Sequence, residues 1–87
     1  MNRMSPAPAV QRAMLEERIQ MYQAAGFEAF LDAEASRAQT PIGPGEQAEL
    51  EQRVRVLGHK SANCYASAAR LAEMLAEIPA DPESPAG

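Results

Sequence analysis

Apolar and small residues recur along residues 46–78 at spacings that alternate between four and three. This period is typical of an amphipathic helix that presents one continuous heptad seam to a partner helix. Large residues stand at the ends of the series and small ones in its middle. The second seam, as we name it, consists of Leu50, Val54, Leu57, Ser61, Cys64, Ala68, Leu71, Leu75 and Ile78.

A looser series with the same spacing runs through residues 6–38 and predicts another long helix, which comes first in the chain. The first seam consists of Leu15, Ile19, Tyr22, Gly26, Ala29 and Ala33, with Phe30 beside it. Gly26 interrupts this helix, and a glycine inside a helix costs about 1 kcal/mol relative to alanine. Because no proline or turn cluster accompanies Gly26, we expect one continuous helix; a break at Gly26 is the alternative.

Prolines and glycines set the limits of the two helices. Residues 39–45 read Gln-Thr-Pro-Ile-Gly-Pro-Gly, which predicts a loop between a helix at 6–38 and a helix at 46–78. Ser5 is a candidate N-cap, because Pro6 suits the first helical position. Residues 1–5 and the proline-rich residues 79–87 are expected to be disordered tails, which leaves one domain at 6–78.

Folding the chain at this loop lets the two seams face each other in an antiparallel hairpin. Phe30 is then expected near Val54, and Leu15 near Ala68 and Leu71. Tyr22 is expected near Ser61 and Cys64, where small side chains leave room for its ring. Large residues opposite small ones interdigitate, so the sequence predicts an all-α hairpin.

Further apolar stripes lie outside the two seams and predict an interface. The small-residue stripe of the second helix consists of Gly58, Ala62, Tyr65, Ala69, Ala72 and Ala76. The first helix carries an outer stripe of Val10, Met14, Met21, Ala24 and Leu31. A single hairpin cannot bury these stripes as well as its seams, and exposed apolar patches mark interaction sites. We therefore expect a homodimeric four-helix bundle whose interface includes the small-residue stripe, Met14 and Met21; a wide core face with nothing attached is the alternative.

Length and charge narrow the possible classes of protein. A domain of 87 residues buries little surface, and with one cysteine it forms no internal disulfide. The net charge of −4 argues against binding nucleic-acid phosphates. The chain contains no apolar run of membrane-spanning length and no apolar signal-peptide core at its start, so we expect a cytoplasmic protein.

Few residues offer catalytic or metal-binding chemistry. Cys64 lies on the second seam, where a structural role is expected, and His59 is five residues away and points to another side of the helix. Acidic residues such as Glu16 and Glu49 are typical of a solvated helix surface. The glycines of the loop lack the lysine and the preceding strand of a phosphate-binding loop. The sequence therefore predicts no enzyme, no metal site and no cofactor.

A polar stripe on the second helix allows a different function. It consists of Arg53, Lys60, Asn63, Ser67 and Arg70. Cations that flank an amide and a hydroxyl can hold a phosphate or another small anion, such as a nucleotide. The alternative is a solvated face on which Arg70 pairs with Glu73 or Glu77.

The runs Leu15-Glu16-Glu17-Arg18-Ile19, Phe30-Leu31 and Glu46-Gln47-Ala48-Glu49-Leu50 resemble small uncharacterised helical hairpins encoded by bacteriophages. The overall plan is similar to the hairpin co-chaperones of type III secretion needle subunits. No specific motif carries either likeness, so neither assigns a family. The leading hypothesis is a protein-binding module such as an inhibitor, adaptor or small chaperone. The alternatives are a ligand-sequestering oligomer and, ranked below it, a DNA-binding regulator.

Overall fold

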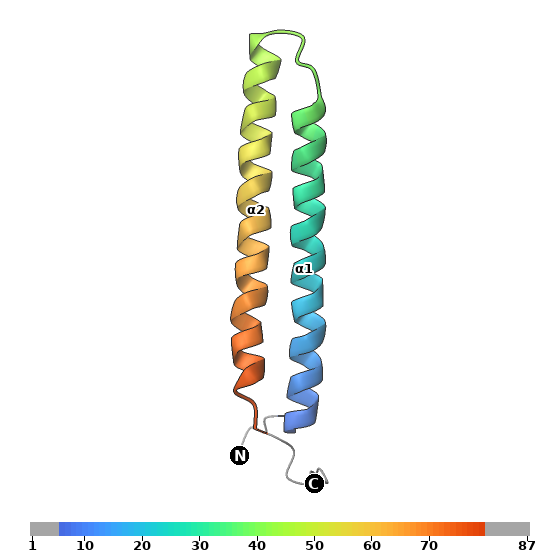
Figure 1. The fold of residues 1–87 in the computed structure, drawn as a ribbon, viewed down its shortest axis with the longest axis vertical. Helices are drawn as coiled ribbons and strands as arrows, with labels where there is room; N and C mark the ends of the chain where they lie inside the picture. The colour runs from blue at the N-terminus through green and yellow to red at the C-terminus, as the bar shows by residue number, and fades with distance from the viewer. Residues whose placement is uncertain (1–5, 80–87) are drawn as a thin grey trace.

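The computed structural model describes residues 6–79 and contains two long helices joined by a short loop. Helix α1 spans Pro8–Ala38 and helix α2 spans Pro44–Ala76. The helices run antiparallel and side by side along their whole length (Figure 1). The all-α hairpin predicted from the two seams is therefore confirmed.

Both helices begin with proline at the first helical position, where the missing N–H has no helical partner to lose. Helix α1 starts at Pro8, after Ala7 as N-cap, which is two residues later than expected. Helix α2 covers 44–76 instead of the expected 46–78, so both of its ends lie two residues earlier. Ser5 and the expected tails at 1–5 and 80–87 lie outside the described residues.

Helix α1 passes through Gly26 without a break. Gly26 is buried against α2, and the packing of its neighbours there offsets the weak helical preference of glycine. Of the two readings of this position, the continuous helix is the one observed.

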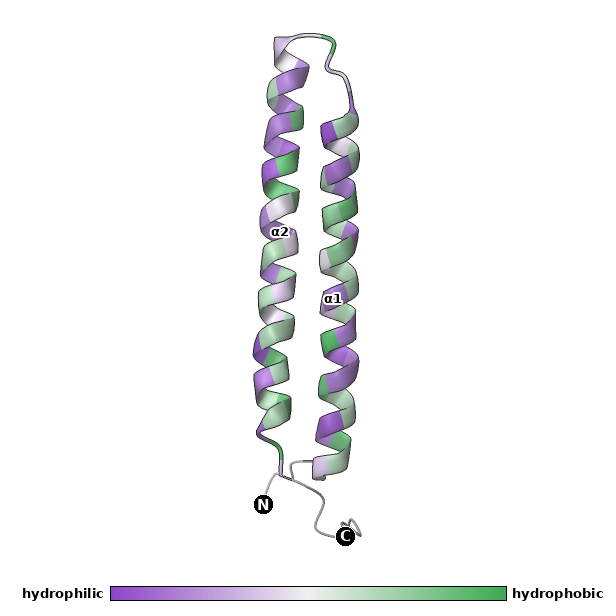
Figure 2. Cartoon of the chain, in the orientation of Figure 1, coloured by the Kyte–Doolittle hydropathy of each residue, from purple (hydrophilic) through white to green (hydrophobic). Residues whose placement is uncertain are grey.

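The predicted seams are the surfaces through which the helices meet. Each residue of the first and second seams is buried or half-buried, while most other helical residues are exposed. Ser36, which was not predicted, extends the first seam by one more position and is buried. Hydrophilic and hydrophobic residues are interspersed along both helices (Figure 2).

Small residues make up the most buried part of the contact. The buried hydrophobic residues are Ala29, Ala33 and Ala68, and no large side chain is fully buried in the described part of the chain. Two buried serines, Ser36 and Ser61, lie among them. The helices therefore approach closely where these small residues lie, but the hairpin provides little hydrophobic core of its own.

Within the described residues, neither helix contains a stretch apolar enough to cross a lipid bilayer.

Candidate interaction surface

The contact around Gly26 determines how the helices are aligned. The Ser61 hydroxyl donates a 2.8 Å hydrogen bond to the Gly26 carbonyl oxygen. A Cβ atom placed on Gly26 would lie 3.0 Å from Cε2 of Tyr65 and 3.2 Å from Cβ of Cys64. Gly26 is therefore level with Ser61–Tyr65 of α2. Whether the Tyr22 ring also lies near Ser61 and Cys64 stays a prediction.

The two seams divide the remaining surface of the hairpin into two opposite sides. Each helical residue is turned about 100° from the preceding one. In an antiparallel pair, the second helix reverses both its chain direction and the direction in which its seam faces. These two reversals cancel, so residues that directly follow a seam position point to the same side on both helices. Residues that directly precede a seam position point to the other side.

The side that follows the seams carries three of the four aromatic residues of the chain. Phe27 and Phe30 of α1 stack with ring centroids 6.0 Å apart. They are 52% and 46% exposed, and Tyr65 of α2 is 42% exposed. We name this side the aromatic face. It consists of Gln20, Gln23, Phe27, Phe30, Gly58, Ala62, Tyr65, Ala69, Ala72 and Ala76.

The ten residues of the aromatic face carry no charge. The nearest charges that follow a seam position are Glu16, which is level with Ala72 and Ala76 at one end of the face, and Glu34, Arg37, Glu51 and Arg55 towards the loop. Nearly all of the face is exposed, including every member of the small-residue stripe. Its central part is therefore uncharged and largely apolar, a feature that marks interaction sites on proteins.

The opposite side, which precedes the seams, is mixed in character, and we name it the methionine face. Its large apolar members are Met14, Met21, Val56 and Met74, all about half exposed, and Ala25 and Ala35 lie on it too. Its polar members are Arg18, Glu28, Asp32, Glu49, Arg53, Lys60, Asn63, Ser67, Arg70 and Glu77. It carries four cations and four carboxylates, so this side has the composition of a solvated face.

The predicted interface residues are thus divided between the two sides. The small-residue stripe lies on the aromatic face, whereas Met14 and Met21 lie on the methionine face. Met21 lines a shallow depression with Arg18, Tyr22 and Ala25 of its own helix. One flat partner surface cannot cover both groups. Phe30 was predicted only as a neighbour of the first seam, and Phe27 was not predicted as an interface residue, although both directly follow a seam position.

The structure brings together only part of the predicted anion site. Asn63, Ser67 and Arg70 line one shallow depression on the outer surface of α2, but Glu73 lines it too and places a carboxylate there. Arg53 lines a different depression, with Glu46 and Glu49. Among the described residues, neither Arg53 nor Arg70 forms a salt bridge, so the expected pairs of Arg70 with Glu73 or Glu77 are not formed.

The residues with catalytic potential stay apart in the structure. Cys64 is a half-buried free thiol on the seam, next to Gly26. His59 is exposed on α2. Within residues 6–79, no group of His, Cys, Asp or Glu side chains could hold a metal ion.

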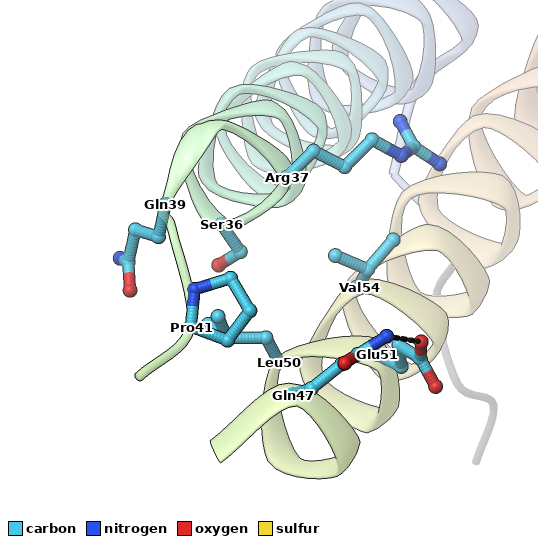
Figure 3. Close-up of a pocket in the computed structure, with 8 residues that line it drawn as sticks. All are labelled: Ser36, Arg37, Gln39, Pro41, Gln47, Leu50, Glu51 and Val54. Atoms are coloured by element: carbon cyan, nitrogen blue, oxygen red, sulfur yellow. Dashed lines mark hydrogen bonds between the residues drawn. The ribbon is translucent and has the colours of Figure 1, made fainter. Parts of the chain in front are cut away.

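A pocket at the loop end of the hairpin was not predicted from the sequence. Figure 3 shows it between the end of α1, the loop and the start of α2. It is lined by Ser36, Arg37, Gln39, Pro41, Gln47, Leu50, Glu51 and Val54. The Gln47 amide donates a 3.2 Å hydrogen bond to Glu51 across its rim. The pocket is open to solvent, and we assign no ligand to it.

No protein-family model, curated protein or solved structure matches this chain. Its function is therefore inferred from its own surface.

Proposed function

We propose that this chain is a non-enzymatic helical module that works by binding protein through its exposed apolar surface. The observation that carries the proposal is the aromatic face, where Phe27, Phe30 and Tyr65 are each about half exposed. Aromatic side chains are enriched at protein interfaces, because they bury a large area at a small cost in conformational entropy. An inhibitor, an adaptor or a small chaperone would each use such a surface.

The shortage of core supports the same proposal. Alanine and serine occupy the buried positions, and no large side chain is fully buried in the described part of the hairpin. Small domains without disulfides or metals depend on regular helix packing or on association for their stability. Binding of protein to the aromatic face would supply the missing apolar burial.

Native mass spectrometry of gently purified protein tests this function. We expect the chain to carry a further protein subunit, either a second copy or a different chain. A monomer that carries a stoichiometric adduct of nucleotide mass would contradict the proposal. So would a bare monomer that retains no protein from extracts of its host.

A second candidate function is the sequestering of a small phosphate compound. The observation that favours it is that Asn63, Ser67 and Arg70 line one depression. A ligand that binds only the folded state raises the melting temperature. Thermal shift against a panel of nucleotides, repeated with Arg70→Glu, tests the idea; the same shift in both proteins, or no shift with any compound, would exclude this site.

A further inference from the structure

We propose that the aromatic face is where a second copy of this chain docks. The resulting dimer has its two-fold axis parallel to the helices, so that α1 of each copy lies over α2 of the other. This inference rests on the proposed function and names the partner and the arrangement. Its first support is that the face contains both halves of a complementary pair, since α1 contributes the projecting rings of Phe27 and Phe30 and α2 contributes the small-residue stripe.

The levels of these two halves along the hairpin match. Gly26 is level with Ser61–Tyr65. Because the helices are antiparallel, Phe27 and Phe30, which follow Gly26, are level with Gly58 and Ala62, which lie towards the start of α2. A two-fold axis parallel to the helices preserves these levels. It therefore sets the rings of each copy over Gly58 and Ala62 of the other, and large residues over small ones pack without voids.

The charges that flank the face are complementary in the same arrangement. Glu34 and Arg37 lie eight and eleven residues after Gly26. They are therefore level with Arg55 and Glu51 of α2. In the dimer, Glu34 faces Arg55 of the other copy, and Arg37 faces Glu51 of the other copy. Both charges of α1 are exposed enough to be shared, because the side chains of Arg37 and Glu34 are 58% and 46% exposed in their own salt bridge. Opposite charges in register favour one arrangement over others.

The area of the face is sufficient for a dimer. The small-residue stripe from Gly58 to Ala76, with Glu16 of α1 beside its last two residues, is roughly 27 Å long at 1.5 Å per residue, and two adjacent helices are roughly 20 Å wide. Two such faces bury roughly 1,100 Å² in total, which is near the lower limit for stable protein interfaces. The methionine face fits a second copy less well, since its cations and carboxylates would have to be desolvated.

Light scattering on matched variants tests which face is used. Ala62→Arg adds a cation to the aromatic face, while Asn63→Arg adds the same cation to the neighbouring exposed position on the other side. We expect a dimer for the parent and for Asn63→Arg. Because a buried charge without a partner is costly, Ala62→Arg should raise the dimer Kd at least about tenfold. Circular dichroism checks that each variant stays helical, and Ala69→Arg serves as a second variant if Ala62→Arg does not fold.

Distance measurements test the arrangement. Ile42 in the loop is 91% exposed and accepts a spin label as Ile42→Cys in a Cys64→Ser background. With the axis parallel to the helices, the two loops lie at the same end, and the labels should be roughly 20–30 Å apart. A dimer on the same face in which the two hairpins point in opposite directions would separate the labels by roughly 70 Å.

The other outcomes separate this inference from the proposed function. If Asn63→Arg dissociates the dimer and Ala62→Arg does not, the second copy docks on the methionine face, and the inference fails while the function stands. A separation near 70 Å overturns the arrangement. A parent protein that stays monomeric at all accessible concentrations overturns the inference, and the function then requires a different protein in the native mass spectrum.

Discussion

Gly26 is buried in α1 at a position where the absence of a side chain leaves room for neighbours on α2. The Tyr65 ring and Cβ of Cys64 lie where a methyl group would have to go. Gly58 is the contrasting case, because a Cβ atom there would meet no atom within 4 Å. The same residue type therefore has opposite effects at the two positions. The spacing of the seams places Gly26 towards the other helix and Gly58 outside the contact, but it does not reveal how closely Tyr65 and Cys64 approach Gly26.

We expect Gly58→Ala to stabilise the hairpin by about 1 kcal/mol, the difference in helical preference between the two residues. Gly26→Ala has the same gain in preference, but overpacking costs about 1–3 kcal/mol, because Cβ of Cys64 is fixed to its backbone and cannot swing away. Its net effect should be destabilising by about 0–2 kcal/mol. Urea denaturation in the monomeric Ala62→Arg background measures both. Equal stabilisation by the two substitutions would show that α1 and α2 are not in contact at Gly26.

Ser61 contributes a polar contact inside an otherwise apolar seam. Its hydroxyl donates to the Gly26 carbonyl oxygen at 2.8 Å, and the residue is buried. We expect Ser61→Ala to lower the free energy of unfolding by about 1 kcal/mol, the typical net value of such a bond. Ser67→Ala is the control, since Ser67 is half-buried on the same helix and forms no side-chain hydrogen bond with the described residues. Indistinguishable losses in the two variants would mean that the bond to Gly26 contributes nothing.

At the scale of the helices, the seams were predictable, but the alignment between them was predicted only approximately. Tyr22 was expected opposite Ser61 and Cys64, and Gly26, one turn later in α1, is the residue that lies there. A heptad period is a local property of the chain, so residues such as Leu57 and Leu71 could be assigned to the contact from spacing alone. Alignment depends instead on how the loop closes and on which small residues let the backbones approach. Ser36 was missed because it is polar and stands at the end of its series, whereas Ser61 lies between two other seam residues, Leu57 and Cys64. The hydrogen bond from Arg12 to the Pro79 carbonyl, 2.9 Å long, joins residues 67 positions apart and has no sequence signature.

The start of α2 is held by a contact that the spacing of its seam does not reveal. The backbone N–H of Ile42 donates a 2.6 Å hydrogen bond to Oε1 of Glu46 in the first turn. A carboxylate there also faces the positive end of the helix dipole. We expect Glu46→Ala to destabilise the hairpin by about 1 kcal/mol in thermal or urea unfolding. Glu49→Ala, an exposed position beyond the first turn, should change stability by less than about 0.5 kcal/mol. Equal effects would show that Glu46 does not cap α2.

At the scale of the whole molecule, the hairpin has a long contact but a small core. Its buried residues are alanine, serine and glycine, and its larger apolar side chains, Phe27 and Met21 among them, are half exposed. The division of these side chains between two opposite sides could have been read from the sequence, because it needs only the seams and the antiparallel direction. What the spacing does not contain is which side is covered, since both sides carry apolar residues. The difference in charge between the two sides is what favours the aromatic face.

A molecule built in this way should owe part of its stability to association. If folding and dimerisation are coupled, a hundredfold increase in protein concentration adds about 2.7 kcal/mol of stabilisation. For a dimer of this size, that should raise the melting temperature by about 5–10 °C. Circular dichroism melts across a hundredfold range of concentration measure the shift. The Ala62→Arg variant is the control, and its melting temperature should be lower and independent of concentration. A parent protein whose melting temperature stays constant over the whole range would show that the hairpin is stable alone, and the exposed rings of Phe27 and Phe30 would then contribute nothing to folding.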